Sequence, residues 1–314
     1  MKNNWFKIIV QLALLLGIST LWAQNDSTVP NTTPQISKYD YHDAFASFFY
    51  TKDGTNTRSA SGQPGAEYWQ NRADYQLSAQ LNEAKNEISG TGIITYTNNS
   101  PDKMNFVWMY LDQNLFKQDS RANAIIPIIG SRNGAQGQIF DGGNKIKSVK
   151  IITTTKGVSI EKEAKYSIND TRMQVFLPQE LKPKGGIVKI KIDYSFISPN
   201  EGSDRMGILE TKNGKIFSIA QWYPRMCVYS DYQGWNHKQF TGRGEFSLIF
   251  GNFDVQMTVP ADHVIAATGE CQNYSEVLTA DQLKRWNAVQ KITAANVAAA
   301  NGTMGPTEIV TLEE

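Results

Sequence analysis

Three histidines, His42, His237 and His263, are the residues best suited to metal or acid–base chemistry in this chain. None is followed by glutamate, so the chain lacks H-E-x-x-H, which sets two zinc ligands and a general base on one helix face. No two histidines are close enough to chelate locally, and no C-x-x-C pair occurs. A zinc site would therefore need long-range ligands, and His237, in the aromatic loop 234–238, is interpreted as structural.

Other catalytic motifs are missing as well. The sequence contains no G-x-S-x-G elbow, no phosphate-binding loop and no dinucleotide fingerprint in a strand context. Gly242, Gly244 and Gly251 are not followed by a helix and are interpreted as turn or bulge glycines. Because a glycosidase-type pair of carboxylates needs no local motif, a stand-alone enzyme with a dispersed carboxylate site remains a rival hypothesis.

The densest segment of the chain runs from Phe217 to Tyr229 and places aromatic side chains around Gln221 and Arg225. Tyrosine and tryptophan combine an apolar body with a polar tip, which suits the wall of a cleft or an interface. A core strand with an exposed end would have the same composition. The residues alone leave both interpretations open.

The two cysteines, Cys227 and Cys271, also allow two interpretations. They can pair in an oxidising compartment. The favoured alternative is that both are separate buried thiols that act as small hydrophobic residues. Sequence spacing cannot show whether they lie within bridging distance.

The N-terminus predicts export. Lys2 and Lys7 precede an apolar run from Ile8 to Trp22, and Ala23 follows. This order is typical of a signal peptide over residues 1–23. A short membrane anchor is the alternative, although the run is shorter than the roughly 20 residues that a spanning helix needs. No later segment is apolar enough to span a membrane, so no span is expected once the signal is removed.

Composition narrows the class of protein further. The formal net charge is +1, which gives no electrostatic sign of nucleic-acid binding. Hydrophobic residues make up 40% of the chain and aromatic residues 11%, enough for a packed core. Residues 24–66 are rich in Asn, Thr, Ser, Gly and Pro, and they are predicted to form a loose segment with an aromatic patch over 39–50.

From Glu67 the pattern is that of a β-rich domain over residues 67–314. Tyr75, Leu77 and Ala79 alternate with polar residues, which is the period of two of a half-buried strand. Many short strands with polar turns predict a mainly β, antiparallel saddle or sandwich. The expected strands are 75–82, 88–98, 106–111, 145–153, 173–177, 188–197, 216–220, 245–250, 254–259 and 263–268.

One helix is expected near the C-terminus, over about 280–300. Thr279 followed by Gln282 fits a capping box, and the segment after it is rich in alanine. Residues 308–312 look like the opening of a further strand. This order indicates a truncated domain rather than a complete protein.

Four pieces of the sequence, taken in order, resemble the N-terminal β-domain of aminopeptidase N-type zinc metallopeptidases, the gluzincins. The resemblance spans residues 67–272 and is strongest to an exported branch of Bacteroidetes type. The four pieces are the hairpin 75–92, the strand 106–112, the stretch Gln221-Trp222-Tyr223-Pro224-Arg225, and the strand 253–262 with Ala267-Thr268-Gly269-Glu270 after it.

The resemblance implies a non-catalytic domain that packs on a thermolysin-like catalytic domain and caps its active site. Zinc, the general base and the transition-state tyrosine belong to that second domain and match no residue of this chain, so the chain alone is predicted to be inactive. A Gln or Glu of the N-terminal domain helps to hold the amine of the peptide substrate in this family. Gln221 is the candidate for that role, with Tyr223 beside it, and Pro224 and Arg225 are expected to hold the loop.

A secreted β-sandwich module that binds glycan or protein through its aromatic residues is the main rival hypothesis. An apolar face along the Gln221 region would favour the peptidase domain, whereas a planar, exposed row of tryptophan and tyrosine would favour the glycan module. Peptide specificity, oligomeric state and the choice between periplasm and secretion have no signal in the sequence.

Overall fold

A computed structural model describes residues 54–125, 142–200, 206–242 and 247–291. The chain divides into two compact units, 1–66 and 67–314. The described end of the first unit, from Gly54 to Ala66, is a turn closed by a bridge between Arg58 and Pro64. The predicted signal peptide, the aromatic patch, His42, the possible strand over 308–312 and the end of the predicted helix lie outside the described residues.

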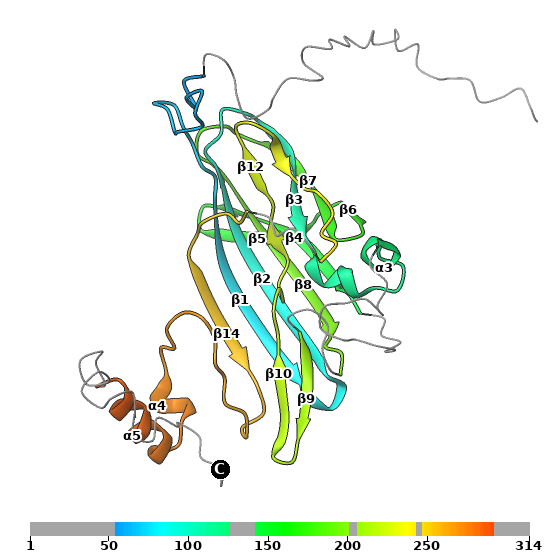
Figure 1. Ribbon diagram of the computed structural model, residues 1–314. Coiled ribbons are helices and arrows are strands. Elements are labelled where there is room, and N and C mark those ends of the chain that lie inside the picture. The colour runs from blue at the N-terminus through cyan, green and yellow to red at the C-terminus, as the bar shows by residue number, and fades with distance from the viewer. Residues whose placement is uncertain (1–53, 126–141, 201–205, 243–246, 292–314) are drawn as a thin grey trace, which may run out of the picture. The chain divides into compact units, whose positions relative to one another are not determined.

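The second unit is mainly β, as the strand pattern predicts (Figure 1). Its larger sheet has six strands in the order β14-β1-β2-β8-β4-β5. All neighbours in it are antiparallel except β1 and β14, which run parallel. The strands are β1 (Arg72–Asn82), β2 (Glu87–Asn98), β4 (Lys145–Thr155), β5 (Val158–Glu163), β8 (Gly186–Ile197) and β14 (Phe253–Thr258).

A second, fully antiparallel sheet has the order β11-β3-β7-β6. Two short two-stranded sheets complete the β structure, β9 with β10 and β12 with β13. The strands are β3 (Met104–Tyr110), β6 (Tyr166–Asn169), β7 (Arg172–Leu181), β9 (Gly207–Thr211), β10 (Gly214–Ser218), β11 (Arg225–Met226), β12 (Val228–Ser230) and β13 (Gly234–Asn236).

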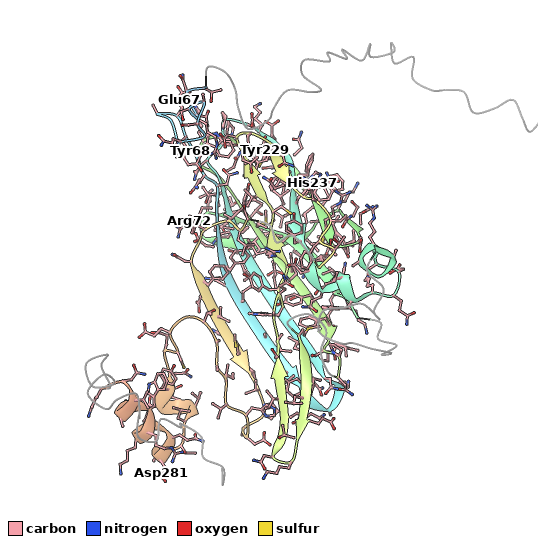
Figure 2. The ribbon with its side chains drawn as sticks, viewed as in Figure 1. Glu67, Tyr68, Arg72, Tyr229, His237 and Asp281 are labelled. Atoms are coloured by element: carbon pink, nitrogen blue, oxygen red, sulfur yellow. The ribbon has the colours of Figure 1, made fainter. Side chains whose placement is uncertain are left out.

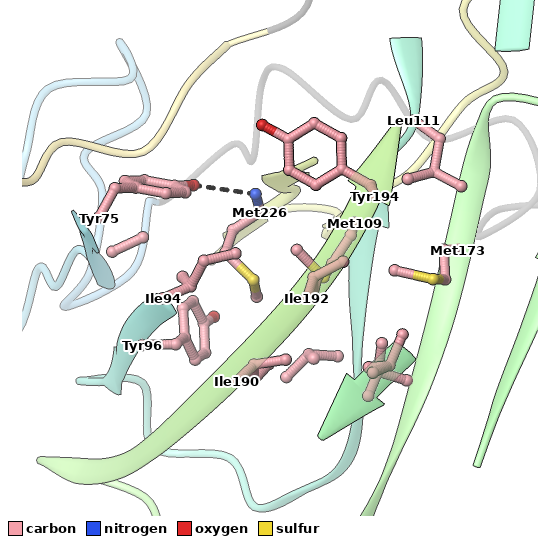
Figure 3. Packing of buried hydrophobic residues seen from close by; sticks show 14 of the residues in the cluster. Tyr75, Ile94, Tyr96, Met109, Leu111, Met173, Ile190, Ile192, Tyr194 and Met226 are labelled. Carbon is pink, nitrogen blue, oxygen red and sulfur yellow. Dashed lines mark hydrogen bonds between the residues drawn. The ribbon is translucent and has the colours of Figure 1, made fainter. Parts of the chain in front are cut away.

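The alternation of side chains explains how the two larger sheets share a core. On β8, Ile190, Ile192 and Tyr194 are fully buried, while Lys189 is exposed. On the facing strands β3 and β7, Val107, Met109, Met173 and Val175 are buried in the same cluster. Figure 3 shows Ile190, Ile192 and Tyr194 of β8 together with Met109 and Met173 of the facing strands. Full burial of one such side chain contributes about 1.5–3 kcal/mol, so this cluster is the main source of stability.

Short helices connect and follow the strands. η1 (Glu83–Lys85) connects β1 to β2. The short helices η2 (Asp112–Phe116) and α3 (Arg121–Ile125) follow β3, and α4 (Tyr274–Val277) and α5 (Ala280–Val289) follow β14. The predicted capping box of α5 is present, because Thr279 accepts from the backbone of Gln282 and the Gln282 side chain accepts from the backbone of Thr279. The helix ends at Val289, and α4 was not predicted.

Two strand predictions are wrong within the described residues. Residues 247–250, the described part of the predicted strand 245–250, belong to no strand, although the Ala73 amide of β1 donates to the Phe250 carbonyl and Ile249 packs against the core. Residues 263–268 pair with no described strand. Apolar residues in both segments caused the error: Leu248, Phe250, Val264 and Ile265 are all exposed, so burial does not drive them into a sheet. Strands β5, β6, β9, β11, β12 and β13 were not predicted.

The edge strand β14 leaves an apolar stripe uncovered in the described part of the chain. Phe253, Val255 and Met257 share a face with Tyr75, Leu77 and Ala79 of β1, so they continue the core face of the sheet. Each is nevertheless 39–51% exposed, although Phe253 stacks on Tyr75 with ring centroids 4.8 Å apart. A continuous apolar stripe of this kind is typical of a surface that further polypeptide covers.

Candidate functional site

Three consecutive polar residues at the start of η2, Asp112, Gln113 and Asn114, are buried directly after β3. The first two side chains hold one segment, residues 220–225, and the third holds another. Asp112 binds Arg225, Gln113 binds the backbone before Trp222, and Asn114 donates to the Asp170 carbonyl (2.7 Å). Because buried polar groups are stable only when hydrogen-bonded, this short helix fixes the loops around it.

Arg225 makes a bidentate ion pair with Asp112. Its Nε donates to one carboxylate oxygen at 2.6 Å and an Nη to the other at 2.9 Å. The Asp112 side chain is fully buried, and that of Arg225 is 10% exposed. Two parallel charge-assisted bonds fix the guanidinium plane, so the chain is held where β10 passes into β11.

The electrostatic surroundings of Arg225 keep it charged. Burial by itself lowers the pKa of the Arg225 guanidinium, but the hydrogen bonds and the negative charge of Asp112 outweigh it, and the net pKa is raised. The guanidinium also lies over the ring of Tyr110, 5.0 Å from its centroid. Because Asp112 neutralises Arg225, the pair presents no net positive charge to its surroundings.

Gln221 has an unusual backbone for a residue with a side chain. Its φ is +52°, in the left-handed region that glycine tolerates best. The Gln113 side-chain amide donates to the carbonyls of Ala220 (2.9 Å) and Gln221 (3.1 Å). The Gln221 side chain is half-buried and forms no hydrogen bond with any described residue, so its amide is available to a ligand.

Tyr223 lies against aromatic residues of the larger sheet. Its ring is 5.4 Å from Tyr75 and 6.1 Å from Phe253, both in edge-on geometry, and 5.1 Å from Trp222. Burial raises the pKa of its hydroxyl. The Tyr75 hydroxyl in turn accepts from the amide of Met226 (3.0 Å; Figure 3). Gln221 and Tyr223 therefore share one segment, which is packed against β1 at Tyr223 and held at its end by Arg225.

Neither described histidine takes part in this site. His237 lies against Trp108 with centroids 4.6 Å apart, and its Nδ1 is 3.0 Å from the Trp235 carbonyl (His237 is labelled in Figure 2). Burial and the nearby charge of Arg172 lower its pKa. His263 pairs with Asp262. Among the residues that the structure describes, no three His, Cys, Asp or Glu side chains are grouped to hold a metal ion.

The two cysteines are both free, and only Cys227 is buried. The expectation of two buried thiols is therefore wrong for Cys271, which lies in the exposed segment that leads to α4. Burial raises the pKa of the Cys227 thiol well above its usual range, and the positive charge of Arg225 offsets this only in part.

This difference predicts one fast thiol and one protected thiol. In the folded chain at pH 8, a disulfide reagent such as DTNB is expected to label Cys271 within minutes and Cys227 only on unfolding, since the thiolate is the reactive species. Raising the pH to 9 should not change the count, because the Cys227 thiol stays protonated there. Mass spectrometry of the labelled peptides checks the assignment, and rapid labelling of Cys227 in native buffer would contradict it.

Sequence reasoning proposed Gln221, Tyr223, Pro224 and Arg225 as site residues but did not predict the short helix η2, which contacts the Gln221 backbone and Arg225. Asp112 was recognised only as the end of a strand, and Gln113 was not considered. The signal was the polar triplet Asp112-Gln113-Asn114 directly after an apolar strand. Its burial depends on long-range contacts with Arg225, 113 residues further along the chain, and so could not be derived from the triplet alone.

Neither a family model nor a curated protein sequence matches the chain. The structure is similar to an M1 zinc metallopeptidase mutant from Deinococcus radiodurans bound to a Tyr-Ser-Ala substrate, at 13% identity and a TM-score of 0.31. That match covers 67% of this chain and 39% of the other. A two-domain M1 zinc metallopeptidase mutant bound to L-arginine is similar at 13% identity and a TM-score of 0.32, over 65% of this chain and 37% of that one. Likeness at this level does not establish a family for this chain.

No helix in the described part of the chain is long and apolar enough to cross a membrane.

Proposed function

We propose that this chain is the non-catalytic N-terminal domain of an exported, zinc-dependent aminopeptidase. In this proposal it forms one wall of the active site, and the side chain of Gln221 holds the free amine of a peptide. The hydrolysis itself is carried out by a thermolysin-like domain that the chain does not include.

The observation that carries the proposal is the state of the segment 221–225. Its far end is fixed by the buried pair of Arg225 and Asp112, while the Gln221 amide has no partner among the described residues. An amide oxygen accepts a hydrogen bond from an ammonium group. A fixed backbone that presents an unpaired amide is suited to binding an amine, because little freedom is lost when the ligand binds.

Charge also supports an amine as the ligand. A peptide N-terminus is positively charged when its α-amino group is protonated, so an unpaired arginine beside it would repel it. Asp112 prevents this repulsion because its carboxylate, 2.6 Å from the Arg225 Nε, neutralises the guanidinium charge. The segment therefore offers a neutral acceptor without a competing positive charge.

The exposed stripe of Phe253, Val255 and Met257 supports a role as part of a larger protein. These side chains continue a core face, and their exposure would be unfavourable in an isolated domain. A further polypeptide that covers β14 would bury them.

The part of the chain that the structure describes offers no group of ligands for zinc. The described residues contain no group of three potential ligands, and His237 is engaged with Trp108 and the Trp235 carbonyl. We assign the metal and the hydrolysis to the catalytic domain. Purified alone with added zinc, the chain is expected to hydrolyse no aminoacyl p-nitroanilide.

The decisive experiment is to sequence the genomic DNA downstream of the codon for Glu314. An in-frame continuation that encodes H-E-x-x-H and a distal glutamate within a few hundred codons would support the proposal. A stop codon directly after Glu314 would overturn it.

In the full-length gene product, Gln221→Ala is expected to raise KM for an aminoacyl p-nitroanilide by about tenfold or more, because hydrogen bonds to charged groups contribute roughly 1.5–3 kcal/mol. A smaller change in kcat is expected, since the contact is present in the ground state as well as the transition state. Lys212→Ala, in the exposed β9–β10 turn, is the control. An unchanged KM would remove Gln221 from the site.

The rival hypothesis is a secreted module that binds a partner without catalysis. A glycan platform needs exposed, coplanar aromatic rings, and no described tryptophan is among the exposed large hydrophobic residues. The apolar stripe on β14 instead favours a protein partner. A stop codon directly after Glu314 would favour this binding module over the aminopeptidase domain.

A further inference from the structure

We infer that Gln113 is a positioning residue: it holds the backbone of Gln221 in the left-handed conformation and so directs the Gln221 amide toward the substrate amine. The statement about substrate rests on the function proposed above. The statement about the backbone rests on the structure alone.

The first observation is where the unusual backbone occurs. Five described non-glycine residues have positive φ. Asn86, Lys156 and Asp170 lie in turns between paired antiparallel strands, where such angles are common. Lys184 precedes Gly185 between β7 and β8. Gln221, like Lys184, lies between strands of different sheets, here β10 and β11, outside any hairpin. No hairpin turn accounts for its φ of +52°, and we attribute this conformation to a long-range contact.

The second observation is the contact that does so. The Gln113 amide nitrogen donates to two successive carbonyls, of Ala220 at 2.9 Å and of Gln221 at 3.1 Å. When both carbonyls point toward one donor, rotation about the φ and ψ bonds of Gln221, which lie between them, is restricted. Gln113 is 2% exposed, so water does not replace these bonds easily.

The third observation concerns the other end of the same amide. The Gln113 Oε1 is buried and has no hydrogen-bond partner among the described residues. Turning the amide over would set this oxygen against two carbonyl oxygens, which repel it. The orientation is therefore determined by the two carbonyls, even though it leaves one buried acceptor unpaired. The Gln113 amide therefore fixes the 220–221 backbone through its nitrogen, while its oxygen stays without a hydrogen bond among the described residues.

The test replaces Gln113 with methionine, which keeps the volume and removes the donor. In the 314-residue chain, NMR couplings that report φ are expected to show Gln221 leaving the left-handed region. Gln113→Asn, one methylene shorter, should give a smaller shift in the same direction and serves if the methionine variant folds poorly. The control is Gln239→Met, since Gln239 also donates to a backbone carbonyl, that of Asn169, away from Gln221.

The second readout uses the full-length gene product. Gln113→Met is expected to raise KM for an aminoacyl p-nitroanilide by about tenfold, as expected for a misdirected hydrogen bond to a charged group, with kcat changed less than about twofold. Gln239→Met should leave both constants unchanged. A purely structural role of Gln113 would lower the fraction of active protein, and hence kcat, without moving KM.

The outcomes separate the two proposals. If Gln221 keeps its positive φ in a folded Gln113→Met chain, the inference is overturned whatever the gene encodes. If φ changes and KM does not, Gln113 fixes the backbone but does not direct substrate binding, and the substrate part is overturned. If the full-length product has no aminopeptidase activity, the proposed function fails, and the φ measurement still decides whether Gln113 holds the loop.

Discussion

Arg225→Met is expected to lower the free energy of unfolding by about 3–5 kcal/mol, because it leaves the Asp112 carboxylate buried without its partner. The pair is bidentate, and the Asp112 side chain is fully buried, so water cannot take the place of the guanidinium without a local opening. Urea unfolding followed by tryptophan fluorescence measures the change.

Two further variants test this explanation. Asp112→Leu combined with Arg225→Met is expected to recover most of the lost stability, since replacing a buried pair by apolar residues is often neutral or stabilising. Lys103→Met removes one partner of the exposed pair with Glu180 (3.0 Å) and should cost at most about 1 kcal/mol. If the double variant were as unstable as the single one, packing rather than the unpaired charge would be responsible.

Gly251→Ala is expected to separate β14 from β1. A Cβ at position 251 would lie 1.6 Å from the carbonyl oxygen of Ala73, and this clash is with backbone, so no rotamer change relieves it. The two strands are joined here by bonds from the amides of Ala73 and Tyr75 to the carbonyls of Phe250 (3.2 Å) and Asn252 (2.8 Å). We expect a loss of about 2–3 kcal/mol, the upper part of the usual cost of overpacking.

Hydrogen exchange locates this effect. The amides of Ala73 and Tyr75 should exchange much faster in the variant, while those of β8 in the centre of the sheet keep most of their protection. Asn252→Ala is the matched control. Asn252 is the exposed neighbour of Gly251, and the hydrogen bonds of its backbone do not depend on its side chain. A Gly251→Ala chain that retains slow exchange at both amides would contradict the close approach of the strands.

Part of the fold follows from local patterns that the sequence carries by itself. The period of two on β1 and β8 predicted which residues are buried, because one face of each strand meets the core and the other meets water. The capping box of Thr279 and Gln282 predicted the start of α5 for the same reason, since both hydrogen bonds are made within four residues. The same patterns failed at 247–250 and 263–268, where apolar residues are exposed rather than paired.

The candidate site combines both kinds of information. The aromatic segment around Gln221 and Arg225 was recognisable in the sequence, and it limited the search to a few residues. What only the tertiary structure decided is how that segment is held: Asp112 and Gln113 reach it from more than 100 positions earlier. Such contacts depend on the register of β3 against β11 and on burial, which local propensities do not encode. Local patterns in the sequence therefore predicted the long strands of the larger sheet and the candidate residues, whereas long-range packing determined which side chains fix the segment around Gln221.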